Sequence, residues 1–274
     1  MTIAEQITKA SGSNFALAFL SLPPEKRRDI TNFYAFCRVV DDLADEPGLP
    51  TGERQAQLDL WRRAIIEPTE GEHLLAADFR ETLARYPIDR TLIGEIISGM
   101  EMDLQGTRYE TLADLQLYCF RVAGAVGLVS IEIFGYQNPS ARDHARALGE
   151  ALQFTNILRD VADDYRNGER IYLPLATMRA YGYSEDDLRA ERHNDAFLQM
   201  MQSLADLAKT NYAASHAAIA AEDRASLRPG LIMGDIYRRV LDKMERDKFR
   251  VFSEQYRLSK AEKLLLVGRR LLFH

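Results

Sequence analysis

Two short acidic segments carry the side chains of this sequence that are best suited to chemistry. Asp41, Asp42 and Asp45 belong to the first segment, and Asp160 and Asp164 belong to the second. In each segment two aspartates stand four residues apart, within a stretch that is otherwise apolar enough to be buried. Carboxylates gathered in a buried cleft need a counter-charge, which a hard divalent cation brought in by a diphosphate substrate would supply. The pattern therefore predicts a magnesium and diphosphate site.

The first segment continues a polar stripe along a helix. Tyr34, Arg38, Asp41 and Asp45 are spaced i, i+4, i+7 and i+11, so they share one face. Most of the remaining circumference is apolar and must be buried, which indicates that the stripe lines a cavity. Arg38 is either a structural ion-pair partner of Asp41 or Asp42, or a clamp for diphosphate, because a guanidinium matches phosphate oxygens bidentately. A solvated acidic helix end is the competing interpretation of the whole stripe.

The second segment shows the same arrangement. Gln153, Asn156, Asp160 and Asp164 are spaced i, i+3, i+7 and i+11, and Arg159 stands beside them. Four polar side chains on a largely apolar helix must satisfy either one another, in a buried hydrogen-bond network, or a ligand. If the two stripes face each other across one cavity, they could hold two or three Mg²⁺ ions around a diphosphate. Such ions would act as Lewis acids on a departing diphosphate.

Composition limits the remaining classes of function. The 274 residues are 46% hydrophobic, enough for a sizeable core, and we expect one domain over residues 1–274 because no linker-like stretch interrupts them. A net charge of −6 argues against nucleic acid as a partner. Two cysteines make a disulfide framework improbable and fit a cytoplasmic location. The N-terminus lacks signal-peptide character, and no run approaches the roughly 18 apolar residues that span a bilayer.

The elements that must position the acidic residues are helices. Apolar residues recur with helical spacing nearly throughout and strand-type alternation is almost absent, so the sequence predicts an all-α bundle with a central cavity. Pro23-Pro24 and Pro47-Gly48-Leu49-Pro50 bracket one helix, Gly135 and Pro139 mark a break, and Asn167-Gly168 marks another, before an extended segment. We expect helices near residues 2–10, 24–46, 51–66, 71–86, 89–104, 111–135, 140–167, 185–222, 229–256 and 259–272.

The last of these helices has two interpretations. Its apolar residues, which include Leu264, Leu265 and Leu271, alternate with Lys263, Arg269 and Arg270. Such a pattern is typical of a closing helix packed on the core, but also of a basic amphipathic helix that makes a peripheral contact with a membrane. Both interpretations stay open at this point, and with them membrane association of a cytoplasmic protein.

Four segments resemble the motifs of the squalene/phytoene synthase family. Residues 32–45 and 153–164 resemble its first and second aspartate-rich motifs, residues 118–127 the motif between them, and residues 170–174 its flap. Their order and spacing agree along essentially the whole chain. The resemblance implies an all-α isoprenoid-synthase fold and a prenyltransferase that joins two isoprenoid diphosphates head to head.

The resemblance also implies roles for particular residues. Tyr118 matches a tyrosine near the reacting carbons, where its ring can stabilise a carbocation; the alternative is a core aromatic with a satisfied hydroxyl. Gly124 and Gly127 would let an apolar tunnel pass close to the backbone, or would serve close helix packing. Carried over by motif, the magnesium ligands are Asp41, Asp42, Asp45, Asn156, Asp160 and Asp164; the substrate-binding residues are Tyr34, Arg38, Gln153, Asn156, Arg159 and Tyr237; and the catalytic residues are Tyr118, Tyr34, Arg38 and Arg159.

Two departures from the family pattern leave part of the site unassigned. Members often carry a serine or a histidine-serine pair ahead of the first phenylalanine, and residues 11–15 do not show which residue replaces it. Glu254 and Gln255 stand where a basic residue is expected, with Arg257 and Lys260 as nearby candidates.

Several reactions fit the family. The leading interpretation is condensation of two farnesyl diphosphates to presqualene diphosphate, as in bacterial hopanoid pathways. The short chain and the sequence of residues 99–104 resemble enzymes of that type most. Alternatives are a squalene or dehydrosqualene synthase, which needs NADPH only if it proceeds to squalene, and a phytoene synthase that uses geranylgeranyl diphosphate. A terpene cyclase or a chain-elongating prenyltransferase also binds diphosphate through magnesium, but the sequences of its motifs differ from those found here. A non-enzymatic assembly-factor homologue is the alternative of another class, against which the four retained carboxylates argue.

Overall fold

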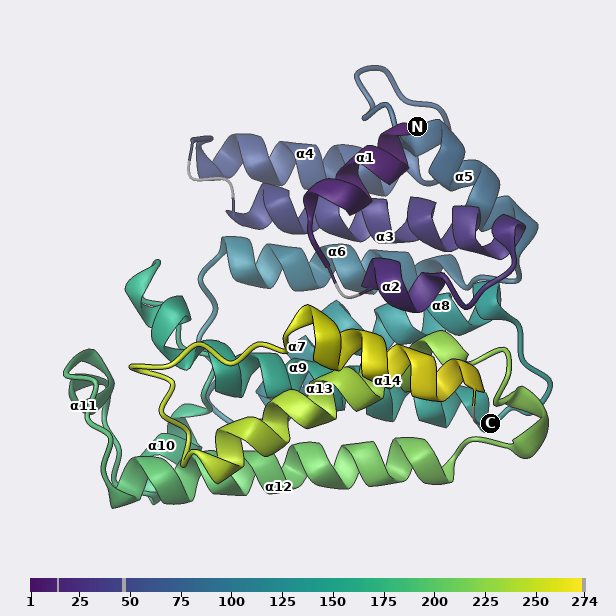
Figure 1. The fold of residues 1–274 in the computed structure, drawn as a ribbon. Coiled ribbons are helices and arrows are strands. Elements are labelled where there is room, and N and C mark those ends of the chain that lie inside the picture. Colours follow the sequence, from purple (N-terminus) through teal and green to yellow (C-terminus); the bar gives the residue numbers. More distant parts are fainter. Residues whose placement is uncertain (14, 46–47, 273–274) are drawn as a thin grey trace.

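The computed structural model describes residues 1–13, 15–45 and 48–272, and these residues form helices, turns and loops without a strand. The predicted all-α class is therefore confirmed. Figure 1 shows the long helices running roughly side by side, with α1 to α6 on one side and α12 to α14 on the other. The helices that surround the site are α3 (Pro24–Asp45), α6 (Arg90–Leu104), α8 (Ala125–Phe134), α9 (Ala141–Arg166) and α13 (Arg228–Arg246).

The other elements are mostly shorter and lie around these five. A π-helical turn, Phe120–Gly124, joins α7 to α8, and a 3-10 turn, Ala221–Asp223, precedes α13. The remaining helices are α1 (Ile3–Ala10), α2 (Phe15–Phe19), α4 (Thr51–Ala64), α5 (Ala76–Arg85), α7 (Leu112–Cys119), α10 (Leu175–Ala180), α11 (Glu185–Arg189), α12 (Asp195–Ala217) and α14 (Lys260–Leu272).

Most predicted helices are present, and the breaks at Gly135 and Asn167 fall where they were expected. The single helix expected over 185–222 is wrong, because Glu191 adopts a positive φ of 51° and Asn194 then caps a new helix. The helix expected over 229–256 ends at Arg246, since Lys248 and Phe249 have positive φ. The helix expected from residue 71 begins only at 76, and α2 and α10 were not expected. Pro47 lies outside the described residues.

Helix α9 is the central element of the core. It packs against α8, α12, α13 and the π turn. A Cβ at Gly149 would lie 2.6 Å from the carbonyl oxygen of Ala123, and one at Gly127 would lie 2.7 Å from that of Ala145. Glycine at these positions therefore lets the two backbones touch. Of the two interpretations of Gly127, the structure shows close helix packing, and the residue also lines the central cavity.

The stretch from α7 to α8 differs from one expectation. Leu112–Phe134 is 23 residues long and, by length and composition alone, is apolar enough to cross a membrane. The expectation that no run approaches that limit is therefore wrong. Half of its most apolar window is buried inside the fold, and the stretch packs against α6 and α9, as a core helix does.

Candidate functional site

A cavity of about 560 Å³ lies between the five long helices and the segment that leads into α2. Its wall is apolar over much of its length, with side chains such as Phe33, Val126 and Met233. At one end the wall becomes polar, where Arg38 and Asp41 of α3 approach Asn156 and other residues of α9. The combination suits a ligand with a long hydrocarbon part and an anionic head.

The carboxylates of α3 are held by arginines. Arg38 donates a hydrogen bond from Nη1 to Oδ2 of Asp41 at 2.6 Å and also pairs with Asp42. Arg170, from the loop after α9, donates from Nη1 to Oδ1 of Asp45 at 2.6 Å. Arg38 and Asp41 also line the cavity. The structure therefore shows Arg38 as an ion-pair partner that also lines the cavity, and its role as a clamp for diphosphate stays a prediction.

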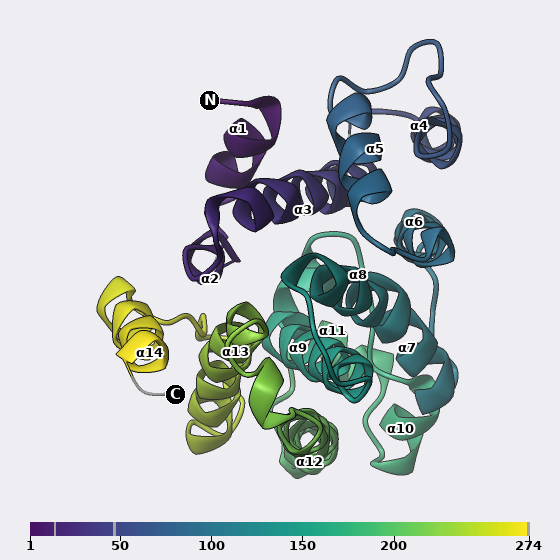
Figure 2. The same cartoon turned by 90° about the vertical axis from the view of Figure 1, so that its right-hand side faces the viewer.

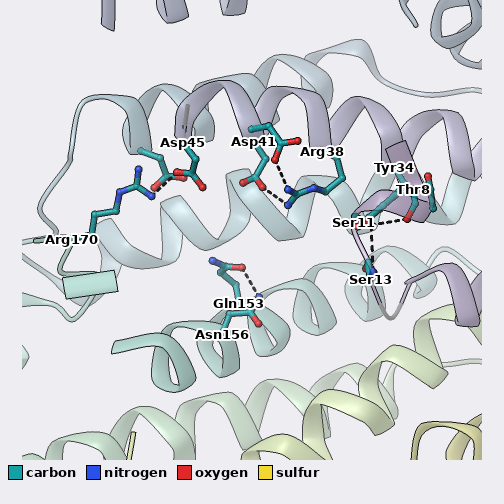
Figure 3. A network of polar contacts seen from close by, with 12 residues as sticks. Thr8, Ser11, Ser13, Tyr34, Arg38, Asp41, Asp45, Gln153, Asn156 and Arg170 are labelled. Carbon is teal, nitrogen blue, oxygen red and sulfur yellow. Dashed lines mark hydrogen bonds and ion pairs between the residues drawn. The ribbon is translucent and has the colours of Figure 1, made fainter. Parts of the chain in front are cut away.

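The polar residues of α9 face the same end of the cavity. Arg159 donates from Nε and Nη2 to the two carboxylate oxygens of Asp160, at 2.7 and 2.5 Å. Asn156 donates to Oε1 of Gln153 at 3.4 Å, while its own Oδ1 is buried without a hydrogen-bond partner. Figure 3 shows Asp41 and Asp45 pointing from α3 toward the amides of α9.

Not all the predicted metal ligands meet in one place. Asp41 and Asn156 line the main cavity, whereas Asp164 lines a small neighbouring pocket together with Arg170 and Tyr172. Asp42, Asp45 and Asp160 line neither of these two cavities. Within the described ranges, no three His, Cys, Asp or Glu side chains are placed so that they could hold a metal ion by themselves. The set of magnesium ligands therefore stays a prediction.

The electrostatics of this end favour a bound cation. Burial raises the pKa of Asp41 to about 6, against the opposing charge of Arg38, and Asp45 adds to the rise. Burial, followed by the charge of Asp160, raises the pKa of Asp164 to about 7. These carboxylates are thus incompletely compensated by their arginines. Their carboxylate oxygens and the unpartnered amide oxygen of Asn156 are all ligands of the kind that Mg²⁺ prefers.

A carboxylate that was not predicted lies between two tyrosines. Tyr118 and Tyr172 donate from their hydroxyls to the two oxygens of Asp103, at 3.0 and 2.8 Å, and their rings stack with centroids 5.2 Å apart. Burial raises the pKa of Asp103 to about 6, and both hydrogen bonds oppose that rise. Asp103 and Tyr118 line the cavity. The sequence carried a signal, because Asp103 follows Ile96 and Met100 at i+7 and i+3, on the buried stripe of α6.

Two further tyrosines stand near the arginines. Tyr34 donates to Oγ of Ser11 at 3.1 Å, and Ser11 and Ser13 both line the cavity. These serines are therefore candidates for the N-terminal serine that the sequence left unassigned. Burial raises the pKa of Tyr237, and the neighbouring charge of Arg159 opposes the shift. Arg257 and Lys260, the candidates for the basic residue that the family pattern expects near the C-terminus, do not line the cavity.

Comparison with known proteins gives a consistent result. The sequence profile described as squalene/phytoene synthase matches residues 8–262. A 15-cis-phytoene synthase from Synechocystis sp. is 35% identical over 277 residues, which cover 96% of this chain and 82% of that protein. The chloroplastic phytoene synthase 1 of Arabidopsis thaliana is 34% identical over 258 residues, which cover 91% of this chain but only 61% of that protein.

Solved structures agree with the fold. The crystal structure of a dehydrosqualene synthase in complex with ligand superposes with a TM-score of 0.83 at 29% identity, over 98% of this chain and 94% of that one. A squalene synthase from Alicyclobacillus acidocaldarius superposes with a TM-score of 0.79 at 27% identity, over 90% of this chain and 93% of that one.

Proposed function

Because the chain belongs to the squalene/phytoene synthase family, whose members are prenyltransferases, we propose that it joins two molecules of geranylgeranyl diphosphate head to head to form phytoene. The observation that carries the proposal is the central cavity, which is apolar along much of its length and is lined at its polar end by Arg38 and Asp41 of α3 and Arg159 of α9. An isoprenoid diphosphate has the same division into hydrocarbon chain and anionic head.

The choice of substrate follows the names of the curated relatives. Both relatives compared above are called phytoene synthases, which favours the C20 alternative over presqualene diphosphate. A second candidate remains: the two solved structures are a dehydrosqualene synthase and a squalene synthase. Their similarity supports condensation of two farnesyl diphosphates, which would stop at presqualene diphosphate or continue to a C30 hydrocarbon.

At the polar end, the side chains of this protein would bind the diphosphate. Arg38 and Arg159 are the charged donors, with Tyr34, Tyr237 and Gln153 completing the contacts. Magnesium, when bound, would neutralise the diphosphate and polarise its bond to the allylic carbon. The residues proposed to hold it are Asp41, Asp42, Asp45, Asn156, Asp160 and Asp164.

The chemistry begins when the C–O bond of one allylic diphosphate breaks and the diphosphate leaves with the electron pair. The double bond of the second substrate attacks the resulting cation, and loss of a proton closes a cyclopropane ring. A second ionisation releases the remaining diphosphate with its electron pair and opens that ring, and loss of a second proton from the resulting cation forms the central double bond of phytoene. The ring of Tyr118, held by Asp103, faces the cavity and can stabilise positive charge on carbon. The apolar wall excludes water that would otherwise quench the cation.

Product analysis with purified protein tests the proposal. The protein is incubated with Mg²⁺ and either geranylgeranyl or farnesyl diphosphate, with and without NADPH, and phosphatase-treated extracts are analysed by mass spectrometry. A C40 hydrocarbon from geranylgeranyl diphosphate is expected.

The other outcomes separate the alternatives. A C30 alcohol from farnesyl diphosphate would indicate presqualene diphosphate, and a C30 hydrocarbon would indicate the dehydrosqualene or squalene route. The absence of any condensed product from both substrates would contradict the proposal and favour a non-enzymatic homologue.

A further inference from the structure

The outward face of α14 is apolar although it faces solvent. The exposed fractions of Leu264, Leu265 and Leu271 are 60%, 73% and 44%. Nine large hydrophobic residues of the described ranges are exposed, and three of them lie on this one helix. Single exposed leucines are ordinary, but a group of them along one helix face marks an interaction surface.

The helix is fixed in place by its other face. Val267 is buried against the core, and Arg270 binds both carboxylate oxygens of Asp235 on α13 at 2.5 and 2.8 Å. Glu262 pairs with Lys243 of α13 at 2.8 Å. These contacts hold the helix in an orientation in which the three leucines project away from the protein.

The charge around this face is positive in an acidic protein. Between residues 257 and 270 there are five Lys or Arg and one Glu, whereas the whole chain has a net charge of −6. Arg257, Lys260 and Arg269 are exposed and, within the part of the chain that the structure describes, form no ion pair. Leucines flanked by free basic side chains match the surface of a bilayer that contains anionic lipids, where the leucines enter the interface and the cations meet headgroups.

The position of α14 brings such a surface close to the cavity. Met233 and Tyr237 of α13 line the cavity, while Asp235 of the same helix holds α14. Helix α2, whose Phe19 also lines the cavity, packs on α13 as well, and Leu20, at its end, is exposed by 56%. Figure 2 shows α14 as the outermost helix on this side, next to α2 and α13.

We propose that α14 docks the protein peripherally on an anionic lipid surface, with Leu264, Leu265 and Leu271 inserted into the interface and Lys260 and Arg269 at the headgroups. One helix then separates the bilayer from the cavity, so a lipid-soluble substrate or product has a short path between the two. The docking itself is independent of which prenyl diphosphate is used.

Vesicle flotation tests this proposal with the full chain. Vesicles of phosphatidylcholine alone are compared with vesicles that also contain phosphatidylglycerol. The wild type should float with the anionic vesicles, less with the neutral ones, and less again at high salt. The double variant Leu264→Ser/Leu265→Ser should bind the anionic vesicles about tenfold more weakly or worse, with an unchanged circular dichroism spectrum.

A matched control removes exposed apolar side chains elsewhere. Ile66→Ser/Leu74→Ser takes away two residues that are exposed by 66% and 79% on the other side of the fold, and should bind as the wild type does. Equal binding by the two double variants would overturn the proposal, as would absence of wild-type binding. Light scattering tests whether a second copy of the chain binds this face instead. A wild-type dimer that becomes a monomer in the Leu264→Ser/Leu265→Ser variant would assign the face to a dimer interface and overturn the proposal.

Discussion

At the scale of single residues, the candidate site is organised by arginines that hold carboxylates. Arg38 and Arg159 bind aspartates of their own helices, and Arg170 reaches Asp45 from the loop after α9. The same guanidinium groups are the natural partners of a diphosphate. If substrate binds as proposed, these side chains would exchange one anionic partner for another, and the carboxylates that they release would become available to a cation.

The first prediction concerns those carboxylates. Asp41→Asn or Asp160→Asn should lower turnover about a thousandfold, because each would remove a proposed magnesium ligand and with it several kcal/mol of charge stabilisation. The thermal unfolding temperature should stay close to that of the wild type. Asp163→Asn is the control, since Asp163 is exposed on the same helix as Asp160 and should retain turnover. Wild-type turnover in the Asp41 or Asp160 variant would refute the metal-site assignment.

The second prediction concerns pH. The pKa of Asp164 is about 7 in the folded protein and 3.8 for a free aspartate side chain, so the folded protein binds this proton more tightly than the unfolded chain does. Ionised Asp164 therefore destabilises the metal-free fold fully above about pH 7, and the penalty disappears as the pH falls toward 4. In EDTA, Asp164→Asn should raise the unfolding temperature by about 2–4 °C at pH 8 and by clearly less at pH 5. An equal gain at both pH values would contradict this.

The third prediction concerns Asp103, which we regard as a positioning residue. Asp103→Asn keeps the size of the side chain but removes one acceptor for the hydroxyls of Tyr118 and Tyr172, so kcat should fall about a hundredfold with little change in KM. Glu101→Gln on the same helix is the control, because Glu101 pairs with Arg62 and does not line the cavity. A drop confined to stability, with kcat unchanged, would assign Asp103 a structural role only.

The sequence predicted part of this site and missed the rest for a physical reason. The two acidic stripes were predictable because helical spacing alone puts each of them on one face. Helical spacing places Asp103 on the buried stripe of α6, but it does not reveal the partners of Asp103 or Arg170, because these are distant in sequence. Tyr172 lies 69 residues from Asp103, and Asp45 lies 125 residues from Arg170. Only the tertiary fold brings these groups together.

At the scale of elements, the crossing of α9 over the π turn fixes the wall of the cavity. The fourth prediction is that Gly149→Ala lowers the free energy of unfolding by about 1–3 kcal/mol, because its Cβ would meet three backbone atoms at 2.6–2.8 Å. Gly52→Ala near the start of α4 is the matched control. Its Cβ would have nothing within 4 Å, so stability should stay equal or rise slightly. Chemical denaturation of both variants measures the difference, and equal effects would contradict the prediction.

The long helices were predictable, whereas the short and irregular elements were not. Periodic burial over α3, α9 and α6 gives a strong signal, because many residues agree on one face. Helices α2 and α10 have five and six residues and offer too few positions for a period. The π turn, Phe120–Gly124, inserts a wider turn into an otherwise continuous helical pattern. The residues before and after it in the sequence are mostly apolar, so the pattern hardly changes.

At the scale of the whole molecule, the cavity limits the length of the substrate. From His144 to Asn156, α9 lines the cavity along thirteen residues, whose ends are about 18 Å apart along the helix axis. The fifth prediction is that Ser130→Phe, which adds a ring to the wall near the apolar end, lowers turnover of geranylgeranyl diphosphate at least about tenfold more than turnover of farnesyl diphosphate. Ser130→Ala should change neither. Competition between the two substrates, measured by mass spectrometry, tests this, and an equal loss for both would contradict it.

The arginine pairs at the polar end of the cavity have a consequence for the life of the protein in a cell. Because Asp41, Asp42, Asp45 and Asp160 each pair with an arginine of the protein itself, we expect the fold to survive the loss of magnesium. When prenyl diphosphates or free magnesium run short, we expect the protein to persist as a folded idle form, resistant to proteolysis. Return of substrate and cation would then restore activity within a binding event, without new synthesis or refolding.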